Sequence, residues 1–271
     1  MLCAKPLDTG HLDVKYLNTK STETVMTIPP EALPTEPNQP PRQIRIPETN
    51  SEDFAEFYGA MMGDGCIYGN MAAFCITCNG ILDEWYLTQY LKKLCFSLFN
   101  IQPKIYYAKK EQVVRLIINS VKITRFLVKL GFPKGRKKDA KIRIPEAFFS
   151  DDKLLAACLR GLIDTDGGIY SHPHTKIMLD FTSVIPSLIT SVHEAFSKLN
   201  LQHGISTNRI QFYSGTKLAK YFSRVGSSNP RNIIRYSQFI QTGITPSAIE
   251  TERLLKHYDT RINVPYHGPV V

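Results

Sequence analysis

The sequence lacks any apolar run that approaches the length of a transmembrane helix, so no membrane is expected as a partner. It also lacks the basic, apolar and small-residue order of a secretory signal. Only six of the 271 residues are cysteine, and their spacing matches no disulfide framework. We therefore expect reduced thiols and an intracellular protein, either in an organelle (mitochondrion or chloroplast) or in a microbial cytoplasm.

Acidic residues are scarce in the middle of the chain. Residues 101–143 contain 13 lysines or arginines and two acidic residues, a net charge of +11, whereas the whole chain carries +9 and the remainder therefore −2. A run of one charge is often only a solvated surface. This run overlaps predicted strands and aromatic residues, and we interpret it as a phosphate-binding region.

Hydrophobic periodicity divides the chain into four parts. Residues 1–50 have little of it and hold eight of the 17 prolines, which predicts an extended or disordered arm. Residues 51–145 and 146–257 have the same order of elements and predict two half-domains. Residues 258–271 form a tail.

Each half-domain is expected to have the order αββαββα. Alternation of Phe74, Ile76 and Cys78 with polar neighbours is typical of a strand with one buried face. The other expected helices and strands follow from similar patterns and end at turn residues. The predicted fold class is α+β: two pseudo-symmetric halves, each with a four-stranded antiparallel sheet that has helices on one face and leaves the other face to a partner.

One short stretch occurs twice, 102 residues apart: residues 57–65 and 159–167. Each copy is an apolar helical segment that ends in Asp-Gly, at Asp64 and Asp166. A single Asp-Gly is usually just a turn. Two copies in matching contexts instead indicate two similar halves that each supply one carboxylate.

Small residues within the two copies favour close packing of the two helices. Gly59 and Gly63 are four residues apart, and so are Gly161 and Thr165, so each pair lies on one helix face. Helices packed in this way bring Asp64 and Asp166 together. Two such carboxylates repel unless they share a proton or a cation. Hard oxygen ligands suit Mg²⁺, which can activate water for phosphodiester cleavage.

The second copy resembles the signature of the LAGLIDADG homing endonucleases at seven of its nine positions. The first resembles a weaker copy, which keeps Gly59, Asp64 and Gly65 and has Met62 in place of the sixth-position acid. The resemblance covers roughly residues 53–236. It implies a monomer with internal pseudo-two-fold symmetry, sheets that form a DNA-binding saddle, and motif helices packed at the centre. Gly59, Gly63 and Gly161 would lie at the helix interface.

The resemblance also implies the site residues. Asp64 and Asp166 would be catalytic and bind Mg²⁺, or Mn²⁺ in its place, with Gly63 and Thr165 as further ligands. The expected basic residues near the scissile phosphates are Lys141 and, in the second half, Arg231, although arginine is the poorer proton donor. The predicted DNA contacts are Cys75, Thr77, Asn79, Tyr106, Lys109, Arg115, Lys138, Arg143, Asp180, Thr182, Arg209, Gln211 and Tyr213.

The implied function is site-specific cleavage of double-stranded DNA by a metal-dependent hydrolase, encoded within an intron or free-standing. Two alternatives stay open: an RNA-binding maturase that acts on intron RNA, and a catalytically silent DNA-binding protein of the same fold. The presence of both Asp64 and Asp166 favours the nuclease. An intein is not expected, because the last residues lack the His-Asn end that splicing requires in that family. We expect no separate helix-turn-helix in the last 40 residues or so, which disfavours a regulator.

Overall fold

The computed structural model of the chain describes residues 43–108 and 111–258. Most of the predicted arm, nearly all of the predicted tail and the predicted DNA contact Lys109 lie outside these residues. The described end of the arm packs on the first half, where the Arg45 N–H donates to the Phe99 carbonyl oxygen at 3.1 Å. Within the described ranges, the structure contains no helix with the length and hydropathy of a membrane span.

Two runs of elements follow one another in the predicted order. The first run consists of α1 (Glu52–Asp64), β1 (Gly65–Ile67), β2 (Ala73–Asn79), η1 (Tyr86–Leu91), α2 (Lys92–Phe99), β3 (Lys104–Ala108), β4 (Val113–Asn119) and α3 (Val121–Lys129). The short helices η3 (Lys137–Asp139) and η4 (Glu146–Ser150) link the two runs. The second run consists of α4 (Asp152–Asp166), β5 (Gly167–Tyr170), β6 (Met178–Thr182), α5 (Pro186–Lys198), β7 (Gly204–Ser206), β8 (Arg209–Phe212) and α6 (Gly215–Arg224).

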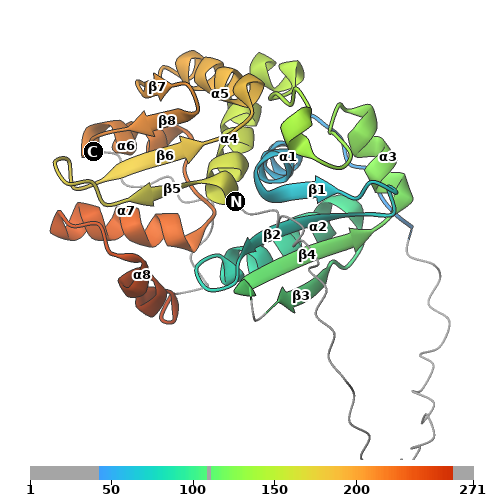
Figure 1. Ribbon diagram of the computed structural model, residues 1–271, viewed down its shortest axis with the longest axis horizontal. Coiled ribbons are helices and arrows are strands. Elements are labelled where there is room, and N and C mark those ends of the chain that lie inside the picture. Colours follow the sequence, from blue (N-terminus) through green and yellow to red (C-terminus); the bar gives the residue numbers. More distant parts are fainter. Residues whose placement is uncertain (1–42, 109–110, 259–271) are drawn as a thin grey trace, which may run out of the picture. The chain divides into compact units, whose positions relative to one another are not determined.

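Two four-stranded antiparallel sheets, one from each run, have the same strand order. The orders are β1-β2-β4-β3 and β5-β6-β8-β7. Figure 1 shows the two sheets on either side of α1 and α4. The predicted α+β fold, with two pseudo-symmetric sheets around paired motif helices, is confirmed.

The helices α1 and α4 form the centre of this arrangement. Both begin at a side-chain cap: Ser51 Oγ accepts from the Phe54 N–H at 3.2 Å, and Asp151 Oδ1 accepts from the Lys153 N–H at 2.7 Å. Every residue from Phe54 to Gly63 and from Leu154 to Thr165 is buried. A helix that is buried on all sides belongs to a core.

Each sheet packs one face into the core and turns the other outward. In β4, Val114, Leu116 and Ile118 are buried, and the residues between them are partly exposed. The strand β6 alternates in the same way. Because successive side chains point to opposite faces of a sheet, the polar positions of these strands share one outward face.

A turn separates β2 from the helix that follows it. Asn79 Oδ1 accepts hydrogen bonds from the N–H groups of Ile81 and Leu82, both at 2.9 Å, which closes a turn after β2. The helix starts at Glu84 and Trp85, passes through the π-helical segment η1 and continues as α2 in regular geometry. Such π-helical insertions are frequent near functional sites.

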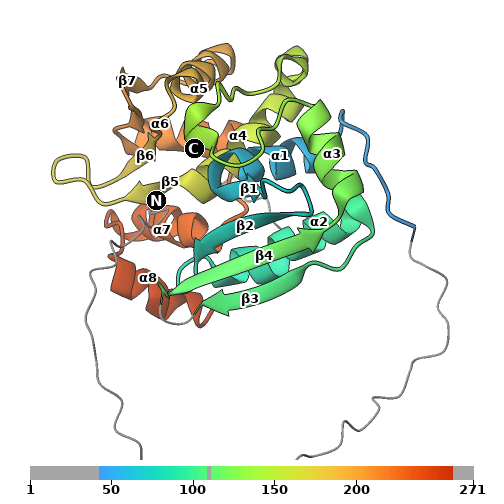
Figure 2. The ribbon, with the colours of Figure 1, turned by 45° about the vertical axis from the view of Figure 1, so that its right-hand side comes forward.

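Two further helices, α7 (Pro230–Thr242) and α8 (Ala248–Leu255), follow the second run, in a region where no helix pair was predicted. The start of α7 has local signals, because Asn229 caps the helix and Pro230 occupies its first turn. Figures 1 and 2 show α7 beside β5, and Arg235 donates to the Ile169 carbonyl oxygen at 2.7 Å. The pair is thus packed onto the second half and does not stand apart from it.

Candidate active site

The two motif helices meet backbone to backbone at two glycines. A Cβ atom on Gly59 would overlap the carbonyl oxygen of Cys158, and one on Gly161 would overlap the carbonyl oxygen of Glu56. Gly59 and Gly161 are 102 residues apart, and so are Glu56 and Cys158, so the same repeat relates the two contacts. The helices therefore pack about a local pseudo-two-fold axis that leaves no room for a side chain at either glycine.

One turn further along, Gly63 faces the end of α4. A Cβ atom on Gly63 would overlap the Thr165 hydroxyl and would lie 3.2 Å from the Asp166 Cβ. Asp64 and Asp166 are the last residues of α1 and α4. The structure thus brings the two predicted metal-binding acids to the adjoining C-terminal ends of the paired helices. Both side chains are only partly buried, so a ligand can reach them.

The two carboxylates are in mutual repulsion. Burial raises the pKa of Asp64 to about 7, the Asp166 carboxylate adds to that rise, and the ammonium group of Lys137 opposes it. Burial also raises the pKa of Asp166, again against the effect of Lys137. The C-terminal ends of both helices add partial negative charge. A bound cation would relieve this repulsion.

Lys137 is the basic residue beside this acid pair. Its Nζ donates to the carbonyl oxygens of Met61 at 3.4 Å, Met62 at 2.9 Å and Gly63. Burial lowers the pKa of Lys137, whereas Asp166 and Asp64 act to raise it. Lys137 therefore closes the end of α1 and holds a positive charge at the point where α1 meets α4.

The sequence analysis expected Lys141 in this position, and the structure differs. The side chains of Lys138 and Lys141 are exposed, and Arg143 forms a 2.7 Å ion pair with Glu194. The linker turns through η3, so Lys137 is the lysine that faces the acids. In a linker with so many basic residues, the inward position depends on this one-turn helix, which residue type alone does not specify. Gly63, a predicted metal ligand, has its carbonyl oxygen bonded to Lys137.

Arg231 holds the corresponding place in the second half, but an acid neutralises it. One guanidinium nitrogen lies 3.1 Å from Asp83 Oδ2, and the other donates to the carbonyl oxygens of Gly167 at 3.0 Å and Asp164 at 3.4 Å. Asp83 is buried in the turn after β2 and also accepts from Asn229 Nδ2 at 2.7 Å. Sequence reasoning missed Asp83, because the pair joins residues 148 positions apart.

Asp164, the sixth-position acid of the second motif, is a structural anchor. Its carboxylate accepts from Ser227 Oγ at 2.5 Å, the Ser228 N–H at 2.6 Å and Asn232 Nδ2 at 2.9 Å. Burial raises the pKa of Asp164 to about 6, and these hydrogen bonds act to lower it. The network fixes the segment that leads to Arg231. Met62 stands at the equivalent position of the first motif, which therefore has no such carboxylate.

A buried ion pair, also missed from the sequence, crosses the helix interface. Arg160 of α4 places its Nε 2.8 Å and an amino nitrogen 2.7 Å from Glu56 Oε2 of α1. Its remaining amino nitrogen donates to the Val225 carbonyl oxygen at 2.9 Å. The fork of the guanidinium group therefore ties α1, α4 and the end of α6 together.

Cys78 contributes a further contact to the acid pair. Its thiol hydrogen-bonds the Asp64 carboxylate, and burial together with the Asp64 charge raises the pKa of Cys78. Cys78 lies on the inward face of β2, whereas its neighbour Asn79 is exposed and closes the following turn. The thiol therefore stays protonated and donates to Asp64.

The predicted DNA contacts of the first sheet form a row on its outward face. The strand register places Thr77 opposite Arg115 and Arg115 opposite Tyr106. The Arg115 guanidinium lies 5.9 Å from the centre of the Tyr106 ring and pairs with Glu111 at 3.0 Å. Cys75, on the same face, is buried.

The outward face of the second sheet is more nearly neutral. The register places Asp180 opposite Gln211 and Thr182 opposite Arg209. Arg209 Nε lies 3.1 Å from Asp180 Oδ1 and donates to Thr182 Oγ1 at 3.4 Å. The Tyr213 hydroxyl donates to Gln211 Oε1. An ion pair thus already satisfies the strand arginine of this face, in keeping with a chain whose positive charge lies mainly in the first half.

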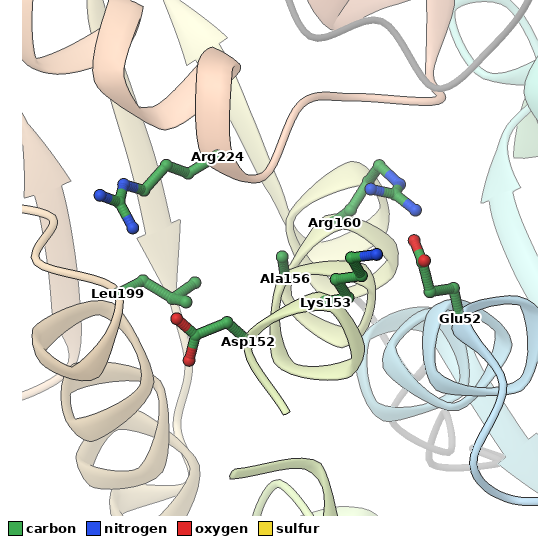
Figure 3. Close-up of a pocket in the computed structure, with 7 residues that line it drawn as sticks. All are labelled: Glu52, Asp152, Lys153, Ala156, Arg160, Leu199 and Arg224. Carbon is green, nitrogen blue, oxygen red and sulfur yellow. The ribbon is translucent and has the colours of Figure 1, made fainter. Parts of the chain in front are cut away.

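A cavity of about 300 Å³ lies at the opposite ends of the motif helices (Figure 3). Glu52 and Asp152, the first residues of α1 and α4, line it. A helix of 13 residues is about 20 Å long, so this cavity is remote from Asp64 and Asp166. Both acidic and basic side chains surround the cavity, and we assign it no part in the chemistry of the acid pair.

The donor set at the ends of α1 and α4 fits a hard divalent cation. Asp64 and Asp166 offer two repelling carboxylates, and carbonyl and carboxylate oxygens are the ligands that Mg²⁺ prefers. The described part of the chain contains no cluster of three or more histidine, cysteine or acidic side chains suited to a metal. An ion here would therefore keep open positions for water or a substrate phosphate.

Comparison with known proteins finds a partial sequence relative and several solved structures of similar fold. No family model matches the sequence. One protein of the A-type ATP synthase of Pyrococcus abyssi (strain GE5 / Orsay) is 31% identical over 127 residues, which are 46% of this chain but only 12% of that protein. Solved structures that resemble this chain include LAGLIDADG proteins.

Two of these structures illustrate the likeness. The homing endonuclease I-DmoI in complex with DNA and Ca has a TM-score of 0.46 and 16% identity, over 78% of this chain and 100% of that chain. The N-terminal LAGLIDADG domain of DUF199/WhiA has a TM-score of 0.46 and 13% identity, over 65% of this chain and 81% of that chain. At these identities the likeness concerns the fold, so the roles of individual residues come from this chain's own geometry.

Proposed function

We propose that this chain is a divalent-metal-dependent endonuclease that hydrolyses phosphodiester bonds of double-stranded DNA. The observation that carries the proposal is the meeting of Asp64 and Asp166 at the adjoining ends of two packed helices, beside Lys137. These two carboxylates would hold Mg²⁺, or Mn²⁺ in its place, with the Thr165 carbonyl as a further ligand. The ion would supply Lewis-acid stabilisation and an activated water.

The protein's own residues provide charge and position. Lys137 puts a fixed positive charge at the acid pair, where it can stabilise negative charge that develops on a scissile phosphate. Arg115 and Tyr106 offer a cation and an aromatic surface on an outward sheet face, and the basic segment of residues 101–143 binds the DNA backbone. The two halves lie in one chain, so a monomer suffices for a complete site.

The finer proposal is a site-specific enzyme of the homing type, encoded within an intron or free-standing. The two alternatives, an intron RNA maturase and a silent DNA-binding protein, use the same outward faces but do not need the acid pair. Substitution of the acid pair should therefore abolish the nuclease function and leave the other two functions unaffected. A preference for folded intron RNA over duplex DNA in a binding competition would favour the maturase.

Cleavage of a plasmid library with random inserts, in the presence of Mg²⁺, tests the proposal. We expect linear product from the unaltered chain, no product without the metal, and none from Asp64→Asn. Asp139→Asn serves as the matched control, because Asp139 is an exposed acid of the nearby linker and its loss should leave cleavage intact. Duplex binding without cleavage by the unaltered chain would support the silent protein instead.

A further inference from the structure

Cys66 and Cys75 form a thiol pair that the proposed cleavage chemistry does not use. They lie directly opposite each other on the antiparallel strands β1 and β2. Residues opposed in this way have Cα atoms roughly 4.5–5.5 Å apart, within the range of about 4.4–6.8 Å over which a disulfide forms. Opposed residues also share a sheet face, so the two sulfurs point to the same side.

The surroundings of Cys75 favour its thiolate. Hydrogen bonds from the side chains of Cys66, Tyr68 and Thr77, together with the nearby Arg115 charge, lower the pKa of Cys75 to about 6 against the opposing effect of burial. The thiolate is the nucleophilic form of cysteine. Cys66 is partly exposed, which gives a small oxidant access to the pair.

The other described cysteines have the opposite character. Cys78, Cys95 and Cys158 are buried, and burial raises the pKa of each thiol. A raised pKa keeps these thiols protonated, and the thiol is a far weaker nucleophile toward an oxidant than the thiolate. Reactivity toward an oxidant is therefore concentrated on the opposed pair of β1 and β2.

We propose that Cys66 and Cys75 are a redox-modification site, which a peroxide oxidises to an intramolecular disulfide and a small thiol reduces again. The Cys75 thiolate attacks one peroxide oxygen, so that an S–O bond forms, the O–O bond breaks and hydroxide leaves. The Cys66 sulfur then attacks the sulfenic acid, so that the S–S bond forms and the S–O bond breaks. The departing oxygen takes the Cys66 proton, and two thiols and one peroxide give one disulfide and two waters.

The disulfide would alter a contact to the segment that carries Lys137. The Cys66 thiol is within hydrogen-bond reach of the carbonyl oxygens of Ile67, at 3.5 Å, and Gly135, at 3.8 Å. The Gly135 N–H in turn donates to the Ile67 carbonyl oxygen at 2.9 Å. Cys66 has a single thiol proton, which the Cys75 thiolate and these carbonyl oxygens share as alternative acceptors. Oxidation removes that proton, so the thiol can no longer donate to Gly135, two residues before Lys137. The oxidation state of the pair is thereby linked to the segment beside the acid pair.

Peptide mapping of the native full-length protein tests this inference without any need for nuclease activity. The protein is treated with an equimolar amount of hydrogen peroxide, and remaining thiols are alkylated. Chymotrypsin then cleaves the chain between Cys66 and Cys75, after Tyr68 and Phe74, because residues 46–91 contain no lysine or arginine for trypsin. Tandem mass spectrometry of the peptides distinguishes Cys75 from Cys78. We expect the Cys66 peptide linked to the Cys75 peptide, and recovery of both thiols after dithiothreitol. Cys95→Ala, the matched control, should leave the linkage unchanged.

Cys66→Ser should prevent the linkage and leave Cys75 as a sulfenic acid that dimedone traps. The decisive measurement is made on the unaltered protein, so the test does not depend on whether a variant folds. Cys66 and Cys75 unmodified in the native protein but oxidised after unfolding would overturn it, and so would a disulfide mainly to Cys3 or between two chains.

Discussion

Gly59 and Gly161 each lie against the backbone of the opposite motif helix, and a Cβ atom on either would overlap a carbonyl oxygen. The two glycines therefore set the distance between α1 and α4, and with it the distance between the acids at the helix ends. Side-chain chemistry at the site depends on this backbone contact.

Replacement of Gly161 by alanine tests that contact. In an exposed helix the change would stabilise by up to about 1 kcal/mol through helix propensity. Here the added methyl group meets backbone that cannot rotate away, and overpacking of this kind costs about 1–3 kcal/mol. We expect a lower free energy of unfolding by urea titration, and a loss of cleavage larger than the loss of DNA binding.

Gly69→Ala provides the control, because a Cβ atom there meets nothing within 4 Å. It should change stability by less than about 0.5 kcal/mol. A gain of stability in Gly161→Ala with unchanged cleavage would show that the glycines do not hold the helices together.

The buried pair Glu56–Arg160 should matter more than any exposed pair. Glu56→Gln leaves the Arg160 charge buried without its counter-ion, which costs about 3–5 kcal/mol. Glu194→Gln removes the exposed partner of Arg143 and should cost about 0–1 kcal/mol. Chemical denaturation of both variants measures the contrast, and equal losses would contradict the role of Arg160 as a tie across the interface.

Lys137 and Lys141 can be separated by substitution with methionine. Lys137→Met removes the positive charge at the acid pair, and loss of one preorganised donor typically lowers a rate by about 10²–10³-fold. Lys141→Met changes only an exposed side chain and should leave the rate nearly unaltered. Single-turnover cleavage with saturating protein distinguishes the two. The reverse order of effects would restore Lys141 to the role expected from the sequence.

Much of the architecture is visible in local sequence patterns. Apolar periodicity and the repeated Asp-Gly stretch predict the two motif helices, the strands and the pairing of Asp64 with Asp166. The selection of Lys137, by contrast, depends on a one-turn helix in a linker of similar basic residues. Asp83 reaches Arg231 only through folding, because the two belong to different halves.

The helix α7 was missed for a related reason. Its first seven residues are all buried, although Arg231, Asn232 and Arg235 are polar. These side chains bind Asp83, Asp164 and the Ile169 carbonyl oxygen, so burial there follows from hydrogen bonds rather than from apolar periodicity. Hydrophobic pattern cannot predict a helix face of this kind. The local indications are the start signals at Asn229 and Pro230 and the stop signal at Gly243, which has a left-handed backbone.

The two sheets should contribute unequally to DNA binding. Arg115→Ala removes a strand cation stacked on Tyr106 and should weaken binding and reduce the salt slope by about 1. Both arginines have an acid partner, but Glu111, the partner of Arg115, is exposed and screened by solvent, whereas Asp180, the partner of Arg209, is mostly buried. Arg209→Ala therefore removes the more fully neutralised cation, and its effect should be smaller. Fluorescence anisotropy over a range of salt concentrations measures both slopes. A larger loss in Arg209→Ala would place the main DNA contact on the second sheet.

Strand-resolved cleavage by the acid variants tests the central claim most directly. If Asp64 and Asp166 act as one shared metal site, then Asp64→Asn, Asp166→Asn and the double variant should all leave supercoiled plasmid uncut, with neither nicked nor linear product, while duplex binding stays intact. Effects of residues that act as a unit are not additive, so the double variant should be no worse than either single one. Nicked plasmid from a single variant would mean that each acid serves one strand alone, and linear product at the unaltered rate would remove both acids from the mechanism.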